Sequence, residues 1–153
     1  MTKPTLLIVD DEKPTREGLR AALEERFDVY LAEDAKAAME LLERESFDVM
    51  LTDFQMPNED GMKLIGRAKS LAKPPVCILM TAYGSEELAV DAMKRGSDDY
   101  IAKGRLQIDE LEMRIARAVR SVVDAARERA GRLGMLTGAG LIAGEALMGI
   151  VMA

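Results

Sequence analysis

Short apolar runs alternate with segments of helical period over the first two thirds of the chain, and this alternation restricts the fold more than any other feature. The apolar runs are residues 6–9, 29–32, 49–52, 76–80 and 100–102. Runs this short, separated by longer amphipathic segments, are typical of a parallel sheet with helices on both faces. We therefore predict an α/β, doubly wound fold, in which ligands bind beyond the carboxyl ends of the strands.

Apolar stripes and boundary residues mark the helices expected between these strands. The stripes are Leu19, Leu23 and Phe27 on the first helix, Ala38, Leu41 and Leu42 on the second, and Leu64, Ile65 and Ala68 on the third. Pro14 stands near the start of the first helix, Ser85 is placed to cap the fourth, and Gly96 suits its end. Each crossover is therefore expected to be a βα unit.

Acidic residues fall at the carboxyl ends of two predicted strands. Asp10 and Asp11 follow the first strand, and Asp53 ends the third, so all three are expected at one rim of the sheet. Clustered carboxylates repel one another unless a cation neutralises them, and oxygen ligands with room for water favour Mg²⁺ or Mn²⁺. With the metal bound, one carboxylate can attack a phosphoryl group.

Two further residues suited to phosphoryl transfer end the remaining strands. Thr81 ends the fourth strand and could donate its hydroxyl to a phosphoryl oxygen, and Lys103 follows the fifth and could pair its ammonium with it. Two acids, an acceptor acid, a hydroxyl and an amine complete the groups needed for metal-assisted transfer to an aspartate.

Each of these residues also has a purely structural interpretation. Asp10 or Asp11 could cap the helix that begins near Pro14, and threonine is common at strand ends. Lys103 could be an ordinary solvated lysine, and Tyr100 an ordinary half-buried strand tyrosine. The complete set favours the functional interpretation.

Taken together and in order, three stretches resemble the receiver domains of bacterial response regulators, especially those attached to sigma-54-dependent activators of the NtrC type. They read LLIVDDE (6–12), FDVMLTDFQMPNEDGMKLI (47–65) and ILMTAYGSEELAVDAMKRGSDDYIAK (78–103). The resemblance covers about residues 5–120. It implies a flavodoxin-like sheet of five parallel strands in the order 2-1-3-4-5, followed by an extended C-terminal helix.

The resemblance also assigns roles to the rim residues. It implies that Asp10, Asp11, Asp53 and the backbone carbonyl of Gln55 bind Mg²⁺, with Mn²⁺ as the alternative. Asp53 would be phosphorylated by a separate histidine kinase, and Thr81 and Lys103 would hold the phosphoryl group. Thr81 and Tyr100 would form the switch, because Thr81 moving inward vacates space for the Tyr100 ring.

One residue departs from the family pattern. Gly104 stands after Lys103, where such receivers usually have a proline in a cis peptide. A cis bond that does not involve proline costs roughly 2.5 to 4 kcal/mol, so the shape of this loop is not predicted.

The composition narrows the function and the location. The net charge of −6 gives the segment no general attraction for nucleic acid or anionic lipid. The chain has no histidine to carry a phosphoryl group and no glycine-rich GKS or GKT loop for ATP. The single cysteine, Cys77, and the lack of a long apolar leader indicate the cytoplasm. We expect a phosphoryl acceptor with at most slow self-dephosphorylation and not an enzyme in the ordinary sense.

The last third of the chain is predicted to extend beyond the receiver domain of residues 1–120. Apolar residues continue at steps of three and four to about Ala125, which favours a helical linker over 121–132 and a coiled-coil homodimer. The face of the fourth helix, fifth strand and fifth helix is the other candidate dimer surface. Residues 133–153 are long and apolar enough for a membrane span, but their glycines and Glu145 argue against one. They resemble the opening of an output ATPase domain, cut short.

Two other classes of function share parts of this pattern. A magnesium-dependent phosphatase with an aspartyl nucleophile would normally carry a second acid two residues after it, where Gln55 stands. A stand-alone binding or shuttle module would lack an output domain, and the sequence alone does not separate it from a regulator of transcription.

Overall fold

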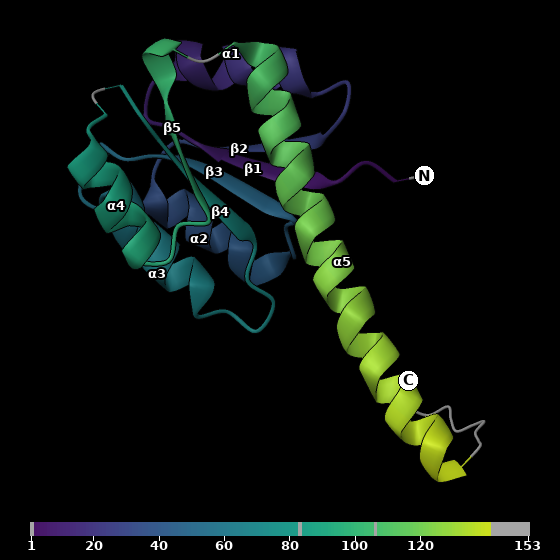
Figure 1. Cartoon of the computed structure of the whole chain (residues 1–153). Helices are drawn as coiled ribbons and strands as arrows, with labels where there is room; N and C mark the ends of the chain where they lie inside the picture. Colours follow the sequence, from purple (N-terminus) through teal and green to yellow (C-terminus); the bar gives the residue numbers. More distant parts are fainter. Residues whose placement is uncertain (1, 83, 106, 142–153) are drawn as a thin grey trace. The chain divides into compact units, whose positions relative to one another are not determined.

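The computed structural model describes residues 2–82, 84–105 and 107–141, and the chain divides into two units, residues 1–119 and 120–153. The first unit is built on a five-stranded sheet, in which all the strands run parallel in the order β2-β1-β3-β4-β5 (Figure 1). The strands are β1 (Thr5–Val9), β2 (Asp28–Ala32), β3 (Val49–Asp53), β4 (Val76–Thr81) and β5 (Asp99–Ala102). The predicted fold class and strand order are confirmed.

In the described part of the chain, five helices and one 3₁₀ turn connect and follow the strands. They are α1 (Lys13–Leu23), α2 (Ala35–Arg44), α3 (Gly61–Lys69), α4 (Glu86–Lys94), the turn η1 (Lys103–Arg105) and α5 (Ile108–Leu141). Pro14 lies in the first turn of α1, and the Ser85 hydroxyl accepts the Leu88 N–H at 3.1 Å at the start of α4, as expected. Gly96, just past the end of α4, has φ +110°, a conformation that suits glycine.

Two layers of apolar side chains hold the helices against the sheet. On one face α2, α3 and α4 pack against residues such as Leu7, Met50 and Leu79. On the other face α1 and the start of α5 pack against residues such as Ile8 and Ile78. Burial on both faces explains why β3 and β4 are buried along their whole length.

One stripe residue lies outside its predicted helix. Phe27 was expected on the first helix, but α1 ends at Leu23 and Phe27 lies in the turn that leads to β2. Its side chain is still buried in the core shared by α1 and α5. The helical spacing therefore identified a core residue but extended the helix too far.

The first part of α5 belongs to the first unit, where Leu111 and Ile115 are fully buried. In the second unit α5 continues to Leu141, and Val122 and Val123 are exposed. Among the described residues, no helix combines the length and apolar character needed to cross a bilayer. The coiled-coil linker and the roles predicted for residues 133–153 stay predictions, and residues 142–153 lie outside the described part of the chain.

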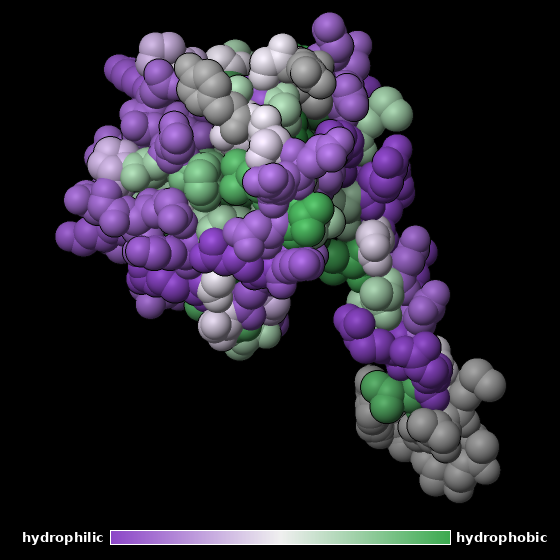
Figure 2. All heavy atoms as spheres, turned by 60° about the vertical axis from the view of Figure 1, so that its left-hand side comes forward, coloured by the Kyte–Doolittle hydropathy of each residue, from purple (hydrophilic) through white to green (hydrophobic). Residues whose placement is uncertain are grey.

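Hydrophilic side chains dominate the face seen in Figure 2, and apolar side chains reach the surface in a few places. On α4 the exposed apolar residues are Val90 and Met93, with 53% and 49% of their surface accessible. Ile108 and Met113, near the start of α5, are also exposed. These residues belong to α4 and α5, the two helices that form the predicted dimer face together with β5.

Candidate functional site

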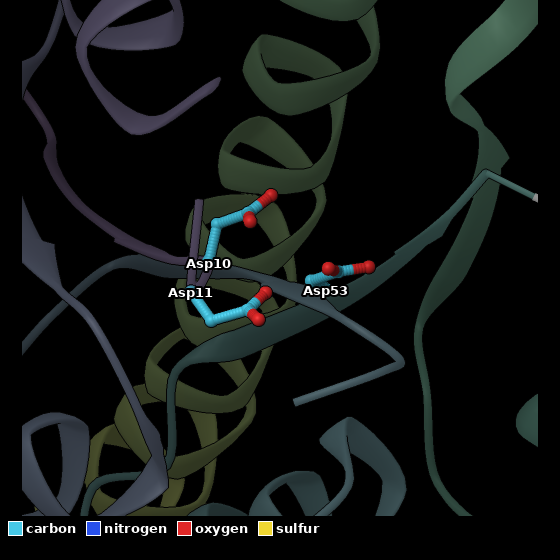
Figure 3. A group of neighbouring side chains, drawn as sticks. All are labelled: Asp10, Asp11 and Asp53. Atoms are coloured by element: carbon cyan, nitrogen blue, oxygen red, sulfur yellow. The ribbon is translucent and has the colours of Figure 1, made fainter. Parts of the chain in front are cut away.

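Three carboxylates meet at the carboxyl ends of β1 and β3 (Figure 3). One oxygen from each of Asp10, Asp11 and Asp53 lies within 4.8 Å of the others. Asp10 and Asp53 are buried, whereas Asp11 is exposed. The structure thus brings together the acids that the sequence predicted at this rim.

The pairing of β1 with its neighbours positions Asp10. Val9 pairs with Thr52 of β3, so Asp10 and Asp53 each follow directly after paired residues. The Asp10 N–H donates to the Ala32 carbonyl at 3.2 Å, and its Oδ1 accepts the Glu12 N–H at 2.9 Å. The residue that caps α1 is Glu12, so neither Asp10 nor Asp11 is the helix cap that the sequence left open. The bond from Glu12 to Asp10 instead orients the Asp10 carboxylate in the acid cluster.

Arg16 is a contributor to the site that the sequence did not single out. Its Nη1 donates to the backbone carbonyl of Asp10 at 2.8 Å from the first turns of α1. The bond fixes the chain at the junction of Asp10 and Asp11. Nothing in the sequence distinguishes Arg16 from the other basic residues of this helix.

Lys103 brings a positive charge into the acid cluster. Its Nζ lies 2.7 Å from Asp10 Oδ2 and 3.4 Å from Asp53 Oδ2. Lys103 was expected at this rim, and its shortest contact is with Asp10. The described residues contain no cis peptide bond, so the chain passes from Lys103 to Gly104 in the trans form.

Burial and charge act in opposite directions on the ionisable groups. Burial raises the pKa of the Asp53 carboxyl above its ordinary value; Lys103 opposes this shift, and the charges of Asp10 and Asp11 add to it. Burial alone would lower the pKa of Lys103, but its hydrogen bond to Asp10 and the charges of Asp53 and Asp10 raise it. The site therefore holds a carboxylate whose charge is costly and an ammonium whose charge is favoured.

The remaining predicted residues lie around this cluster. Thr81 ends β4, one residue beyond the Met80 that pairs with Asp53, and it is buried. Tyr100 lies on β5, half-buried against the core under α2, α3 and α4. Gln55 is exposed, two residues beyond Asp53, and metal binding by its carbonyl stays a prediction.

Gly61, the first residue of α3, packs against the backbone of Asp53. A Cβ at Gly61 would lie 2.2 Å from the Asp53 carbonyl oxygen and 3.0 Å from Leu79 Cδ1. The Gly61 N–H also donates to the Phe54 carbonyl at 2.8 Å. Only glycine lets α3 begin this close to the end of β3, because the atom that a side chain would meet belongs to the backbone.

The donor set fits a hard divalent cation. All three side chains offer oxygen, and the exposure of Asp11 leaves room for coordinated water, which Mg²⁺ retains in proteins. The Lys103 ammonium, 2.7 Å from Asp10 Oδ2, already offsets part of the Asp10 charge, so the ammonium and a metal ion would compete for that carboxylate.

Comparison of the sequence with known proteins finds a matching family and similar relatives. A sequence model described as the response regulator receiver domain matches residues 6–116. The transcriptional regulatory protein FixJ of Bradyrhizobium diazoefficiens is 35% identical over 130 residues, which make up 84% of this chain and 63% of FixJ. The response regulator protein PilR of Pseudomonas aeruginosa is 38% identical over 112 residues, or 70% of this chain and 25% of PilR. The chain thus spans less than two thirds of the length of either relative.

A solved structure gives the same match in three dimensions. The solution structure of the beryllofluoride-activated NtrC4 receiver domain dimer has a TM-score of 0.71 and 29% identity to this chain. The match covers 76% of this chain and 97% of that one. The similarity therefore extends over about three quarters of this chain and nearly all of the other.

Proposed function

The chain belongs to the response regulator receiver domain family, and on that premise we propose that Asp53 accepts a phosphoryl group from a separate histidine kinase. The predicted resemblance to NtrC-type receivers is confirmed by the match to the NtrC4 receiver domain. The observation that carries the proposal is the position of the buried Asp53 carboxylate beside Asp10, Asp11 and Lys103. A nucleophile in this setting has charges of both signs within reach of an incoming phosphoryl group.

Asp10, Asp11, Asp53 and the carbonyl of Gln55 would hold Mg²⁺, or Mn²⁺ in its place. When bound, the cation offsets negative charge on the transferring phosphoryl oxygens. An Asp53 oxygen forms the new bond to phosphorus while the bond from phosphorus to the kinase histidine nitrogen breaks, and the electron pair of that bond returns to the imidazole. The Lys103 ammonium then pairs with a phosphoryl oxygen, to which the Thr81 hydroxyl also donates.

The new charge on Asp53 is expected to shift the population of the domain. Phosphorylation adds strong hydrogen-bond acceptors, which favours any state in which Thr81 and Lys103 have moved inward. Tyr100 follows Thr81, and this changes the surface formed by α4, β5 and the start of α5. Val90 and Met93 on that surface are exposed apolar residues that a partner or a second copy of the chain could cover.

We place the domain in a regulator of transcription that acts through an output domain, as the printed name of FixJ suggests for that relative. Homodimers would form through the α4–β5–α5 surface or through the continuation of α5. The proposed location is the cytoplasm, which the free, buried Cys77 fits. We expect neither nucleic acid nor membrane binding by this segment, and at most slow self-dephosphorylation.

The test is incubation of the protein with acetyl phosphate and Mg²⁺, which transfers a phosphoryl group and releases acetate, followed by intact-mass analysis. Oligomer analysis is done in parallel with beryllofluoride, which mimics the phosphoryl group without adding its mass. We expect the mass of one added phosphoryl group in the wild type and in the control Asp124→Ala, since Asp124 is exposed on α5. Asp53→Ala should show no addition. Equal modification of Asp53→Ala would refute the assignment of the acceptor.

A further inference from the structure

The Tyr100 side chain ends in a buried hydroxyl that has no hydrogen-bond partner among the described residues. Its Oη is enclosed and makes no hydrogen bond to any of the residues that the structure describes. The rest of the ring is half-buried against the core under α2, α3 and α4. A buried hydroxyl that makes no hydrogen bond lowers stability, so packing alone holds the ring in this inward position.

Gly84 supplies the space that the hydroxyl occupies. This residue lies in the loop between β4 and α4. A Cβ at position 84 would lie 2.4 Å from Tyr100 Oη, 3.3 Å from its Cζ and 3.5 Å from the Ala102 Cβ. Non-bonded carbon and oxygen atoms do not approach to 2.4 Å, so an alanine at 84 and the inward hydroxyl cannot occupy these positions together.

We propose that Gly84 is the positioning residue that admits the Tyr100 ring to its inward site, and that any side chain at position 84 drives the ring outward. The proposal rests on the proposed function only in treating Tyr100 as part of the switch. The predicted clash itself depends only on the distances between Gly84 and Tyr100. The Tyr100 hydroxyl occupies the space that a side chain at position 84 would fill, so the two cannot be present together.

The ring is the part that should yield, as a comparison with Gly61 shows. A Cβ at Gly61 would meet the Asp53 carbonyl, which is backbone and cannot turn aside. At Gly84 the nearest described atom is the far end of a side chain, and no hydrogen bond from the described residues restrains its tip. Rotation of Tyr100 about its χ1 bond into another staggered rotamer would relieve the contact without moving the sheet.

The first test is the accessibility of Tyr100 in Gly84→Ala. The rate of nitration of Tyr100 by tetranitromethane is measured by peptide mass spectrometry, with Tyr30 in the same chain as the reference. We expect Tyr100 to react at least about tenfold faster in Gly84→Ala. Such a change corresponds to a shift of about 1.4 kcal/mol or more in the free-energy difference between the inward and outward positions of the ring. The control Gly66→Ala, where a Cβ meets nothing within 4 Å, should react like the wild type. A Tyr100 rate in Gly84→Ala equal to the wild-type rate overturns the proposal.

A second test covers the case in which Gly84→Ala does not fold. The double variant Gly84→Ala/Tyr100→Ala is compared with Tyr100→Ala by urea denaturation, because without the ring a Cβ at 84 has no hydroxyl to meet. We expect the alanine at 84 to leave the stability of the Tyr100→Ala background unchanged. An equal loss of stability in both backgrounds would place the conflict in the loop backbone and overturn the proposal.

Phosphorylation separates failure of this inference from failure of the proposed function. If the wild type takes up no phosphoryl group from acetyl phosphate, the proposed function fails, while the nitration result still decides the role of Gly84. If the wild type is modified, Gly84→Ala should also be modified at Asp53, because position 84 is outside the acid cluster. Its oligomeric state should then respond less to phosphorylation than that of the wild type.

Discussion

Replacing Asp53 by asparagine should make the protein more stable in the absence of divalent cations. The change keeps the size of the side chain but removes its charge from a site where that charge is unfavourable. Lys103 keeps its shorter contact, 2.7 Å to Asp10, so the substitution leaves no ammonium unpaired. We expect a gain and not a loss of stability because the pKa of Asp53 is raised, mainly by burial, which makes the charged form unfavourable.

The size of the effect can be worked from the distances. With an effective dielectric constant of about 20, two like charges at the 4.8 Å limit repel by about 3.5 kcal/mol. This repulsion applies between Asp53 and the buried Asp10. The repulsion between Asp53 and the exposed Asp11 is only a fraction of it, because water screens Asp11. Lys103, at 3.4 Å from Asp53, attracts it by about 5 kcal/mol. Because attraction and repulsion nearly cancel, the cost of burying the charge decides the outcome, and we expect a gain on the order of 2 kcal/mol.

The assays are urea denaturation and thermal unfolding of the wild type and Asp53→Asn at several pH values, with EDTA and with Mg²⁺. A gain on the order of 2 kcal/mol corresponds to a rise in Tm of roughly 6 to 10 °C. With Mg²⁺ the difference should shrink, because the wild type gains more from the cation, whose binding stabilises the folded state.

The pH dependence has a definite sign. Since the pKa of Asp53 is raised on folding, its protonation favours the folded state below the unfolded pKa of about 3.9, and this contribution is lost as the pH rises through the folded pKa. The advantage of the asparagine variant should therefore be absent near pH 4 and grow above it. An asparagine variant that is no more stable than the wild type at pH 7 in EDTA would show that burial of this charge is not the controlling term.

Three further substitutions test other parts of the structure. Lys103→Met should raise the affinity for Mg²⁺ by roughly tenfold, or about 1.4 kcal/mol, because it removes the ammonium 2.7 Å from Asp10; calorimetric titration showing weaker binding would contradict the competition. Gly61→Ala should lower the free energy of unfolding by about 2 to 3 kcal/mol, since its Cβ meets the Asp53 carbonyl at 2.2 Å, and unchanged stability in urea would contradict this contact. Leu111→Ala should cost about 2 to 5 kcal/mol in the same assay, and a loss under about 0.5 kcal/mol would mean that α5 does not pack on the sheet.

The sequence was sufficient to predict the sheet because each strand is marked locally. Runs of apolar residues define β3 and β4, and acids at strand ends define the rim, so the meeting of Asp10 with Asp53 follows from parallel pairing alone. The pattern was less reliable at a helix end: Phe27 has helical spacing but lies beyond α1, because a turn can carry an apolar residue back into the same core.

Contacts that depend on exact distances were beyond the sequence. Nothing in the sequence separates Gly61 and Gly84 from the other glycines, and only the structure shows that one lies against the Asp53 backbone and the other against the Tyr100 hydroxyl. The bond from Arg16 to the Asp10 carbonyl is equally invisible, since many basic residues of a helix could make it. Residue type and spacing identify the participants in a site, whereas the clearances between them depend on how the loops pack.

The conflict of charges that lowers the stability of the site is also what would make it responsive. Asp53 is buried near two other acids, and a single ammonium is shared between it and Asp10. A phosphoryl group on Asp53 would offer Lys103 more negative charge than either carboxylate does, so the ammonium gains by moving away from Asp10. Asp10 then needs another cation, and a divalent ion meets that need. In a site where every charge was already matched, phosphorylation would have no such rearrangement to drive.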